Sequence, residues 1–156
     1  MRIIVFLLSI FSALSLLAQS SEAASSDCLV VLKAASSDFA AIAQAHKAQV
    51  IAHSDSNLNW WLKTAATDCS ALQSLPGVDT VATPLMMMVT LKPGATLPKA
   101  EIEKLGGIVY HDFASISAAS IVLPSEKIAA LAALSGIKQV REDRAVSPAR
   151  KPGTTK

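Results

Sequence analysis

The sequence predicts an α+β fold that is built twice in tandem, and three observations support this prediction. Short apolar runs of strand length alternate with segments of helical period along most of the chain. Turn and stop signals, chiefly Pro-Gly, Gly-Gly and Lys-Pro-Gly, separate these segments. The second half of the chain also aligns with the first, without a gap, when it is shifted by 59 residues.

The alignment of the two halves extends over strand, helix and turn positions. It pairs Lys33 with Lys92 and Gly77 with Gly136 as well as apolar residues with apolar residues, for example Val30 with Val89, Leu72 with Leu131 and Val81 with Val140. A chance match of alanine-rich sequence is the alternative, but matching lysine and glycine residues favour an internal duplication.

The first half contains six short elements in the order strand, helix, strand, strand, helix, strand. Strands are expected at 28–33, 49–53, 58–63 and 79–81, and helices at 39–47 and from Thr67 or Asp68 to Leu75. In the second half, strands are expected at 86–91 and 117–123, and helices end at Gly106 and Gly136. Ser125 is the expected cap of the last helix, which would face the sheet with Ile128, Leu131 and Ala132.

This order of elements is that of the ferredoxin-like βαββαβ sandwich. We therefore expect tandem ferredoxin-like sandwiches, each an antiparallel four-stranded sheet with two helices on one face and an open opposite face. Alternation in strand 117–123 places Ala119, Ile121 and Leu123 on one side of the sheet. If these larger residues face the helices, the open face of the second sheet is small and smooth.

The amino terminus has the pattern of a secretory signal peptide, with Met1-Arg2 before an apolar run and then small polar residues. Cleavage is expected after Ala23, with cleavage after Ser20 as the competitor. An uncleaved anchor is the other alternative, but the apolar run is short for a membrane span. An extracellular or periplasmic location with no membrane attachment after cleavage follows.

Composition limits the partners of the chain. Hydrophobic residues make up 51% of the sequence, which argues against a disordered protein. The formal net charge of +2 is too small to indicate nucleic-acid binding, and the late basic residues are typical of a solvated tail. We expect a monomer.

The two cysteines, Cys28 and Cys69, are expected to form a disulfide, because export places them where a disulfide persists. Two buried thiols or an intermolecular link are the alternatives. The histidines lack ligand spacing with either cysteine, so neither a metal site nor a cofactor is expected.

Three stretches carry a family resemblance: Val89-Thr90-Leu91-Lys92-Pro93-Gly94, Leu105-Gly106-Gly107-Ile108-Val109-Tyr110-His111, and the segment from Ile128 to Arg144. In this order and at these separations, they resemble the propeptide of subtilisin-like serine proteases and the free-standing inhibitors built on it. The resemblance covers Met86 to Ala149, with a degenerate copy over Cys28 to Leu85. It implies domains at 24–85 and 86–149, followed by a flexible tail at 150–156.

The resemblance also implies how the chain would meet a protease. The sheet would pack against a pair of surface helices, with Glu142 and Asp143 at the amino-terminal ends of those helices, where a negative charge is favoured. Val146, Ser147, Pro148 and Ala149 would occupy the four subsites before the scissile position as an added strand. An exposed charged turn is the alternative interpretation of the acidic pair.

No pattern in the sequence indicates an enzyme. The chain has no Gly-x-Ser-x-Gly motif and no glycine-rich phosphate loop, and its histidines, aspartates and serines show no nucleophile-and-base arrangement. Glu101 with Glu103 is typical of an exposed helix surface. No protease domain follows Ala149 in this sequence.

The first half differs from the second in two respects. Its counterpart of the acidic tail, Ala82-Thr83-Pro84-Leu85, has no carboxylate. It also carries Trp60 and Trp61 where the second half has small residues, and alternation sends one indole to each side of the strand. The indole on the open face either anchors a partner or packs between the halves or under the linker, and packing is favoured because it uses the area better. Met86, Met87 and Met88 are expected in strand and core.

The sequence therefore predicts a secreted inhibitor of a subtilisin-like serine protease, with the second half active and the first half degenerate. Two other classes stay open. The chain could instead assist the folding of a separately encoded protease of this type, or it could be a non-inhibitory scaffold that binds other proteins.

Overall fold

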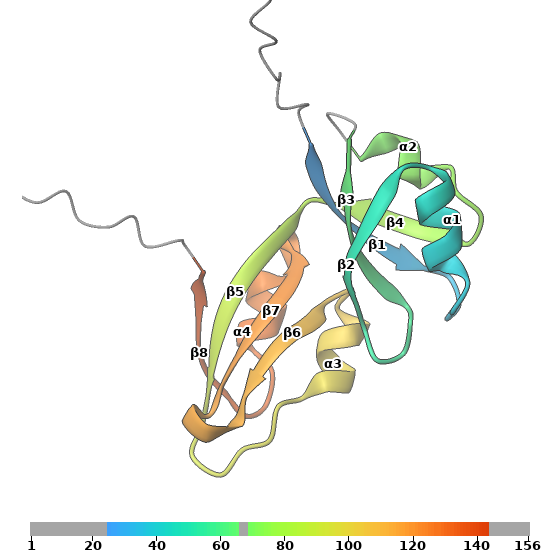
Figure 1. The fold of residues 1–156 in the computed structure, drawn as a ribbon. Helices are drawn as coiled ribbons and strands as arrows, with labels where there is room; N and C mark the ends of the chain where they lie inside the picture. The colour runs from blue at the N-terminus through green and yellow to red at the C-terminus, as the bar shows by residue number, and fades with distance from the viewer. Residues whose placement is uncertain (1–24, 66–68, 144–156) are drawn as a thin grey trace, which may run out of the picture.

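The chain folds into two four-stranded antiparallel sheets with short helices, in a computed structural model that describes residues 25–65 and 69–143 (Figure 1). The first half consists of β1 (Ser26–Leu32), α1 (Phe39–Ala45), β2 (Ala48–His53), β3 (Asn59–Thr64), α2 (Ser70–Gln73) and β4 (Val78–Ala82). The second half consists of β5 (Pro84–Leu91), α3 (Lys99–Lys104), β6 (Ile108–Phe113), the 3₁₀ turn η1 (Ala114–Ile116), β7 (Ala118–Pro124), the 3₁₀ turn η2 (Ser125–Lys127), α4 (Ile128–Ala132) and β8 (Ile137–Glu142).

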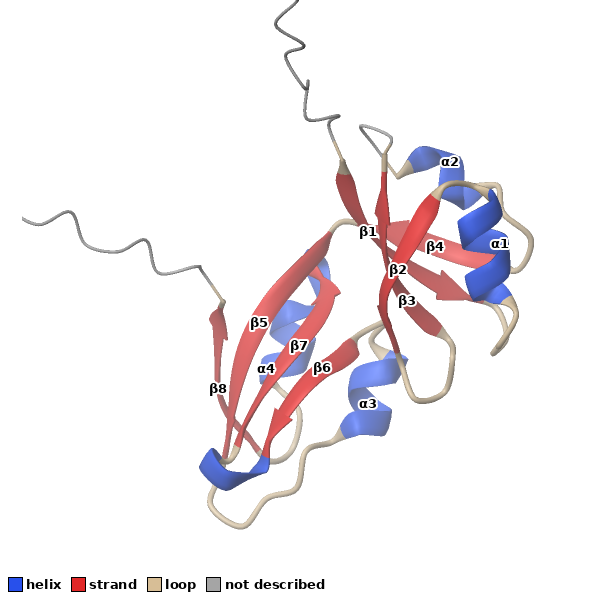
Figure 2. Ribbon diagram, in the orientation of Figure 1, coloured by secondary structure: helices blue, strands red, loops and turns tan. Residues whose placement is uncertain are grey.

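The strand order confirms the predicted fold class. The sheets have the orders β2-β3-β1-β4 and β6-β7-β5-β8, and all neighbouring strands are antiparallel. Each half therefore places its first and third strands in the centre of the sheet, as a ferredoxin-like βαββαβ unit does. Figure 2 shows the helices of each half on one side of its sheet.

The two halves also share their irregularities, at positions related by the same 59-residue shift. β1 has a bulge between Val31 and Leu32, and β5 has one between Thr90 and Leu91. A second pair of bulges, in β2 and β6, is related in the same way. Bulges of this kind are built into a strand by its sequence. Their recurrence supports the duplication inferred from the sequence.

Only Thr83 separates the last strand of the first half from the first strand of the second half. Pro84 and Leu85, which the sequence groups with the first half, pair with β7 in the second sheet. The connection between the halves is therefore a single residue.

Trp60 lies in the core of the first half, on the face of the sheet that the helices cover. It is 2% exposed, its ring centroid lies 5.6 Å from that of Phe39, and its Nε1 donates a hydrogen bond of 3.0 Å to the Asn57 carbonyl. Burial of this indole with its N–H paired is the favourable arrangement for tryptophan. The other buried residues of this core are Cys28, Val30, Leu32, Ala43, Ala48, Leu62, Leu72, Leu75 and Val78.

The core of the second half confirms the predicted alternation in β7. Ala119, Ile121 and Leu123 are fully buried and pack on the helix side, together with Met87, Val89, Leu91, Ile102, Leu131 and Ile137. The prediction for the last helix is wrong in two details. Ala132 is exposed, and no cap hydrogen bond from a side chain begins α4, because the chain enters it through the 3₁₀ turn at Ser125.

The two halves pack against each other, so the open face of the second sheet is not open along its whole length. Leu29, Ile108 and Val122 form a buried cluster, with Ala52, Trp61 and Met86 packed around it. Trp61 is therefore the open-face indole and lies between the halves, which is one of the two packed positions expected for it, and Met86 and Met87 lie in interface and core. Figure 1 shows the hairpin between β2 and β3 reaching beside α3.

Candidate functional site

The exposed side of the second sheet is organised in rows, because residues opposite each other in antiparallel strands share a face. The register gives a first row of Ile108, Val122 and Met86, which the first half covers. Below it lie a second row and a third row. We call these two rows the lower face: His111, Ser120, Met88 and Arg141, then Phe113, Ala118, Thr90 and Gln139.

The lower face has a small, buried centre and larger side chains at its margins. Ser120 and Ala118, in the central strand β7, are 2% and 7% exposed, whereas His111, Phe113, Gln139 and Arg141 on the edge strands are exposed. The smooth centre agrees with the prediction from alternation. The apolar margin on β6 was not predicted.

That margin is the most apolar exposed part of the described chain. Tyr110, Phe113 and Ile116 are its exposed large hydrophobic residues, with exposed fractions of 36%, 37% and 68%. Ring contacts run along β6, with centroid distances of 5.3 Å from Trp61 to Tyr110, 4.2 Å from Tyr110 to His111 and 5.8 Å from His111 to Phe113. Clustered exposed apolar side chains of this kind mark interaction surfaces.

The charge on the lower face is basic. Arg141 is its one permanently charged residue, and none of the eight residues is a carboxylate. With its amide oriented to accept, Gln139 places its oxygen 3.0 Å from Arg141 Nε and 3.1 Å from Nη2. The neighbouring Asp112 lies opposite Ala119, on the helix side, with its carboxylate 3.7 Å from Lys99 Nζ. A partner for the lower face is therefore expected to be neutral or acidic.

The predicted acidic pair lies at the end of β8, which is an edge strand of the second sheet. Glu142 pairs with Met87, and the Asp143 N–H donates a hydrogen bond of 2.9 Å to the Met86 carbonyl, so pairing continues one residue past the strand. Both residues are exposed. Alternation places Glu142 on the helix side and Asp143 on the opposite side, level with the first row.

The other predicted binding residues, Val146, Ser147, Pro148 and Ala149, lie outside the described residues. The same holds for the predicted signal segment 1–23, the tail 150–156 and the predicted helix caps Thr67 and Asp68. The strand that precedes this segment, β8, is the edge strand opposite to β6, and β6 is the strand that β2 and β3 of the first half contact (Figure 1).

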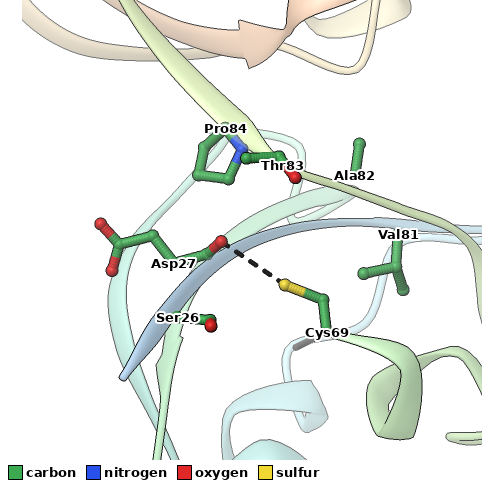
Figure 3. Close-up of a pocket in the computed structure, with 7 residues that line it drawn as sticks. All are labelled: Ser26, Asp27, Cys69, Val81, Ala82, Thr83 and Pro84. Atoms are coloured by element: carbon green, nitrogen blue, oxygen red, sulfur yellow. Dashed lines mark hydrogen bonds between the residues drawn. The ribbon is translucent and has the colours of Figure 1, made fainter. Parts of the chain in front are cut away.

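The predicted disulfide between Cys28 and Cys69 is present, with 5.7 Å between the two Cα atoms. It ties β1 to the start of α2, beside a cleft of about 390 Å³ that Figure 3 shows. The Cys69 sulfur lies 3.5 Å from the Asp27 carbonyl oxygen. Because this sulfur has no proton in the disulfide, the interaction is a contact and not a hydrogen bond. The cleft walls are small side chains and backbone, and they bring together no pair of acid and base.

The described residues contain no group of three histidine, cysteine, aspartate or glutamate side chains that could hold a metal ion. In this same part of the chain, no helix has the length and apolar character needed to span a membrane.

One residue that matters to the arrangement of this site was missed in the sequence. Asn59 is fully buried in β3, and its Nδ2 donates hydrogen bonds of 2.8 Å to the Glu103 carbonyl and 2.9 Å to the Gly107 carbonyl. Asparagine is a poor strand residue. Its position next to two tryptophans in a short strand was the one feature of the sequence that could have indicated a buried, hydrogen-bonded asparagine.

Comparison with known proteins adds no family assignment, since the chain matches no family model and no curated protein.

Proposed function

We propose that this protein inhibits a subtilisin-like serine protease through its second half. The observation that carries the proposal is the position of β8. This edge strand borders a sheet face with exposed margins and leads directly into the segment that resembles the substrate-like tail of the family. Product-like inhibition needs a folded sheet next to a peptide that can extend into the cleft, and the described sheet would supply the first of these.

The sheet would support the binding segment 146–149 by fixing the backbone at Asp143, just before it. The hydrogen bond from the Asp143 N–H to the Met86 carbonyl holds the backbone at this point, so less freedom remains to be lost when the segment binds. In the cleft, Val146 to Ala149 would add a strand to the protease, where backbone hydrogen bonds supply affinity and side chains supply selectivity.

The two acidic residues have different parts in this proposal. Asp143 lies on the side of the sheet that would face the protease, where its carboxylate can meet the amino-terminal end of a surface helix. Glu142 lies on the helix side and could reach such a helix only beyond the edge of the sheet. We therefore assign the larger contribution to Asp143.

The proposed compartment is extracellular or periplasmic, because the disulfide between Cys28 and Cys69 is of the kind that persists in oxidising compartments. Removal of the predicted signal segment would give the mature chain of residues 24–156 that the following test uses.

The test is a titration of a subtilisin-type protease with the mature chain, with a trypsin-type protease as the control. We expect near-stoichiometric inhibition of the first protease alone. Ala149→Asp should weaken inhibition by roughly thirtyfold or more, because it places a carboxylate in a subsite that takes a small residue. Thr154→Asp makes a similar charge change farther along the tail and should leave inhibition unchanged.

Two results would overturn the proposal. The protease could stay fully active or simply digest the mature chain, in which case the resemblance is to the fold alone. Alternatively, Ala149→Asp and Thr154→Asp could inhibit as well as the unmodified chain, which would exclude the tail from the cleft. Activity that returns in step with digestion of the chain would instead favour the folding-assistant function.

A further inference from the structure

The sheet face of the first half that corresponds to the lower face is partly buried, because it packs against the second half. The 59-residue shift relates Ala52, Trp61 and Leu29 to His111, Ser120 and Met88, which form the second row. In the first half, this row packs against Ile108, Val122 and Met86. The equivalent surfaces of the two halves therefore have different partners: one meets the neighbouring half, and the other remains available.

Polar contacts fix the two halves in register. The two hydrogen bonds from Asn59 end on the carbonyl of Glu103, in the last turn of α3, and on the carbonyl of Gly107, which follows that helix. The Asp55 N–H donates a hydrogen bond of 3.1 Å to the Glu103 carboxylate. All three bonds come from the β2–β3 hairpin and its flanks, and all three reach α3 or the residues that follow it.

The approach of the first half also depends on a glycine. Gly106 has φ of +81°, and a Cβ there would lie 3.2 Å from the Val31 side chain. A larger residue would adopt a strained backbone and would crowd the Val31 side chain, which would have to shift. Glycine at this position therefore allows close packing between the end of α3 and the first half.

We propose that the first half is an internal brace, which stabilises the second half and does not bind a protease itself. Its sheet face is occupied, and it covers the end of α3 and the apolar first row, where β6 and β7 would otherwise meet water. The brace has a further consequence for inhibition, which rests on the proposed function. The brace keeps the second half folded against digestion and so makes inhibition last.

The test compares two substitutions at one partly buried position between the halves with one at an exposed neighbour. Trp61→Ala removes the side chain that packs on the second half. Trp61→Phe keeps an aromatic ring and removes the indole N–H, which has no partner among the described residues. Lys63→Ala changes an exposed residue two positions along on the same side of β3.

The first measurement is amide hydrogen exchange in the mature chain without protease. Trp61→Ala should speed exchange in β6 and β7 by roughly tenfold or more, because these strands lose their cover. Trp61→Phe should have a much smaller effect, and Lys63→Ala none. If Trp61→Ala does not fold, Asn59→Ala is measured with the same expectation. Unchanged exchange in β6 and β7, with altered exchange confined to the first half, would overturn the brace.

The second measurement is the lifetime of inhibition of a subtilisin-type protease. Trp61→Ala should shorten this lifetime in proportion to the change in exchange, because digestion follows the population of the open state. An equal lifetime would overturn the link to inhibition. Because hydrogen exchange is measured without protease, it tests the brace independently of whether the chain inhibits a protease.

Discussion

Substitution of Asn59 by aspartate gives the sharpest expectation, because the change keeps the shape of the side chain and replaces its two amide donors by a carboxyl, which donates only while it is protonated. The Nδ2 atom donates to two carbonyls at 2.8 and 2.9 Å in a site that is fully buried. At about 1 kcal/mol for each hydrogen bond, Asn59→Ala should lower the free energy of unfolding by about 2 kcal/mol at any pH.

Asn59→Asp should behave differently, because its effect depends on protonation. Burial beside two carbonyl oxygens raises the pKa of the introduced carboxyl in the folded state. A protonated carboxyl retains one of the two donors, so the cost at about pH 4 is about 1 kcal/mol. As pH rises above about 3.9, the unfolded state ionises while the folded state stays protonated, and about 1.4 kcal/mol is lost per pH unit.

The order of stability of Asn59→Ala and Asn59→Asp should therefore reverse as pH rises. Asn59→Asp is expected to be the more stable below about pH 4.5 and the less stable above it, with a cost of about 5 kcal/mol at pH 7. Urea unfolding of the mature chain, followed by tryptophan fluorescence between pH 4 and 7, measures both costs. Parallel pH profiles, or a cost below about 0.5 kcal/mol for Asn59→Ala, would refute the assignment of these hydrogen bonds.

Three further predictions concern stability and docking. Replacing Cys28 and Cys69 by serine should lower the free energy of unfolding by up to about 4 kcal/mol relative to the oxidised protein, for a sequence separation of 41. Urea unfolding measures this cost, and unmodified protein with its disulfide reduced should be about as unstable as the serine variant. Gly107→Ala should cost about 1–3 kcal/mol, because its Cβ would lie 2.9 Å from the Ile102 side chain; an unchanged thermal midpoint would contradict this. Phe113→Ala combined with Ile116→Ala should leave the unfolding free energy within about 0.5 kcal/mol. The same pair should weaken inhibition about tenfold if the β6 margin contacts the protease, and equal inhibition would exclude that contact.

The fold was predictable because its signals are local and occur twice. Alternation alone assigned Ile121 and Leu123 to the core. The glycine stop at Gly106 came close to the end of α3 at Lys104, whereas α4 ends at Ala132, before Gly136. The same 59-residue shift that aligns Val30 with Val89 also relates the bulges of the two sheets. Helix details were harder, because α4 is too short for periodicity to distinguish Leu131 from Ala132.

The packing of the halves was only partly predictable. Alternation placed one tryptophan on each side of β3, and the area argument favoured packing of the open-face indole between the halves or under the linker. Neither argument decided which tryptophan this is, or which of the two places it takes. The partners of Asn59 were not predictable, because they belong to residues more than forty positions away. The bulge between Val109 and His111 also breaks the alternation that would place Tyr110, so its contact with Trp61 had no signal in the sequence.

Binding to a protease with an open or a filled cleft tests the inhibitor proposal most directly. The mature chain would be titrated by calorimetry into a subtilisin-type protease whose catalytic serine carries a small sulfonyl group, which leaves the subsites open. A second titration would use the same protease with its subsites filled by a covalently attached peptide. We predict tight one-to-one binding in the first titration and a loss of about a hundredfold or more in the second. Equal affinity in both titrations, or no binding in either, would contradict product-like occupation of the cleft.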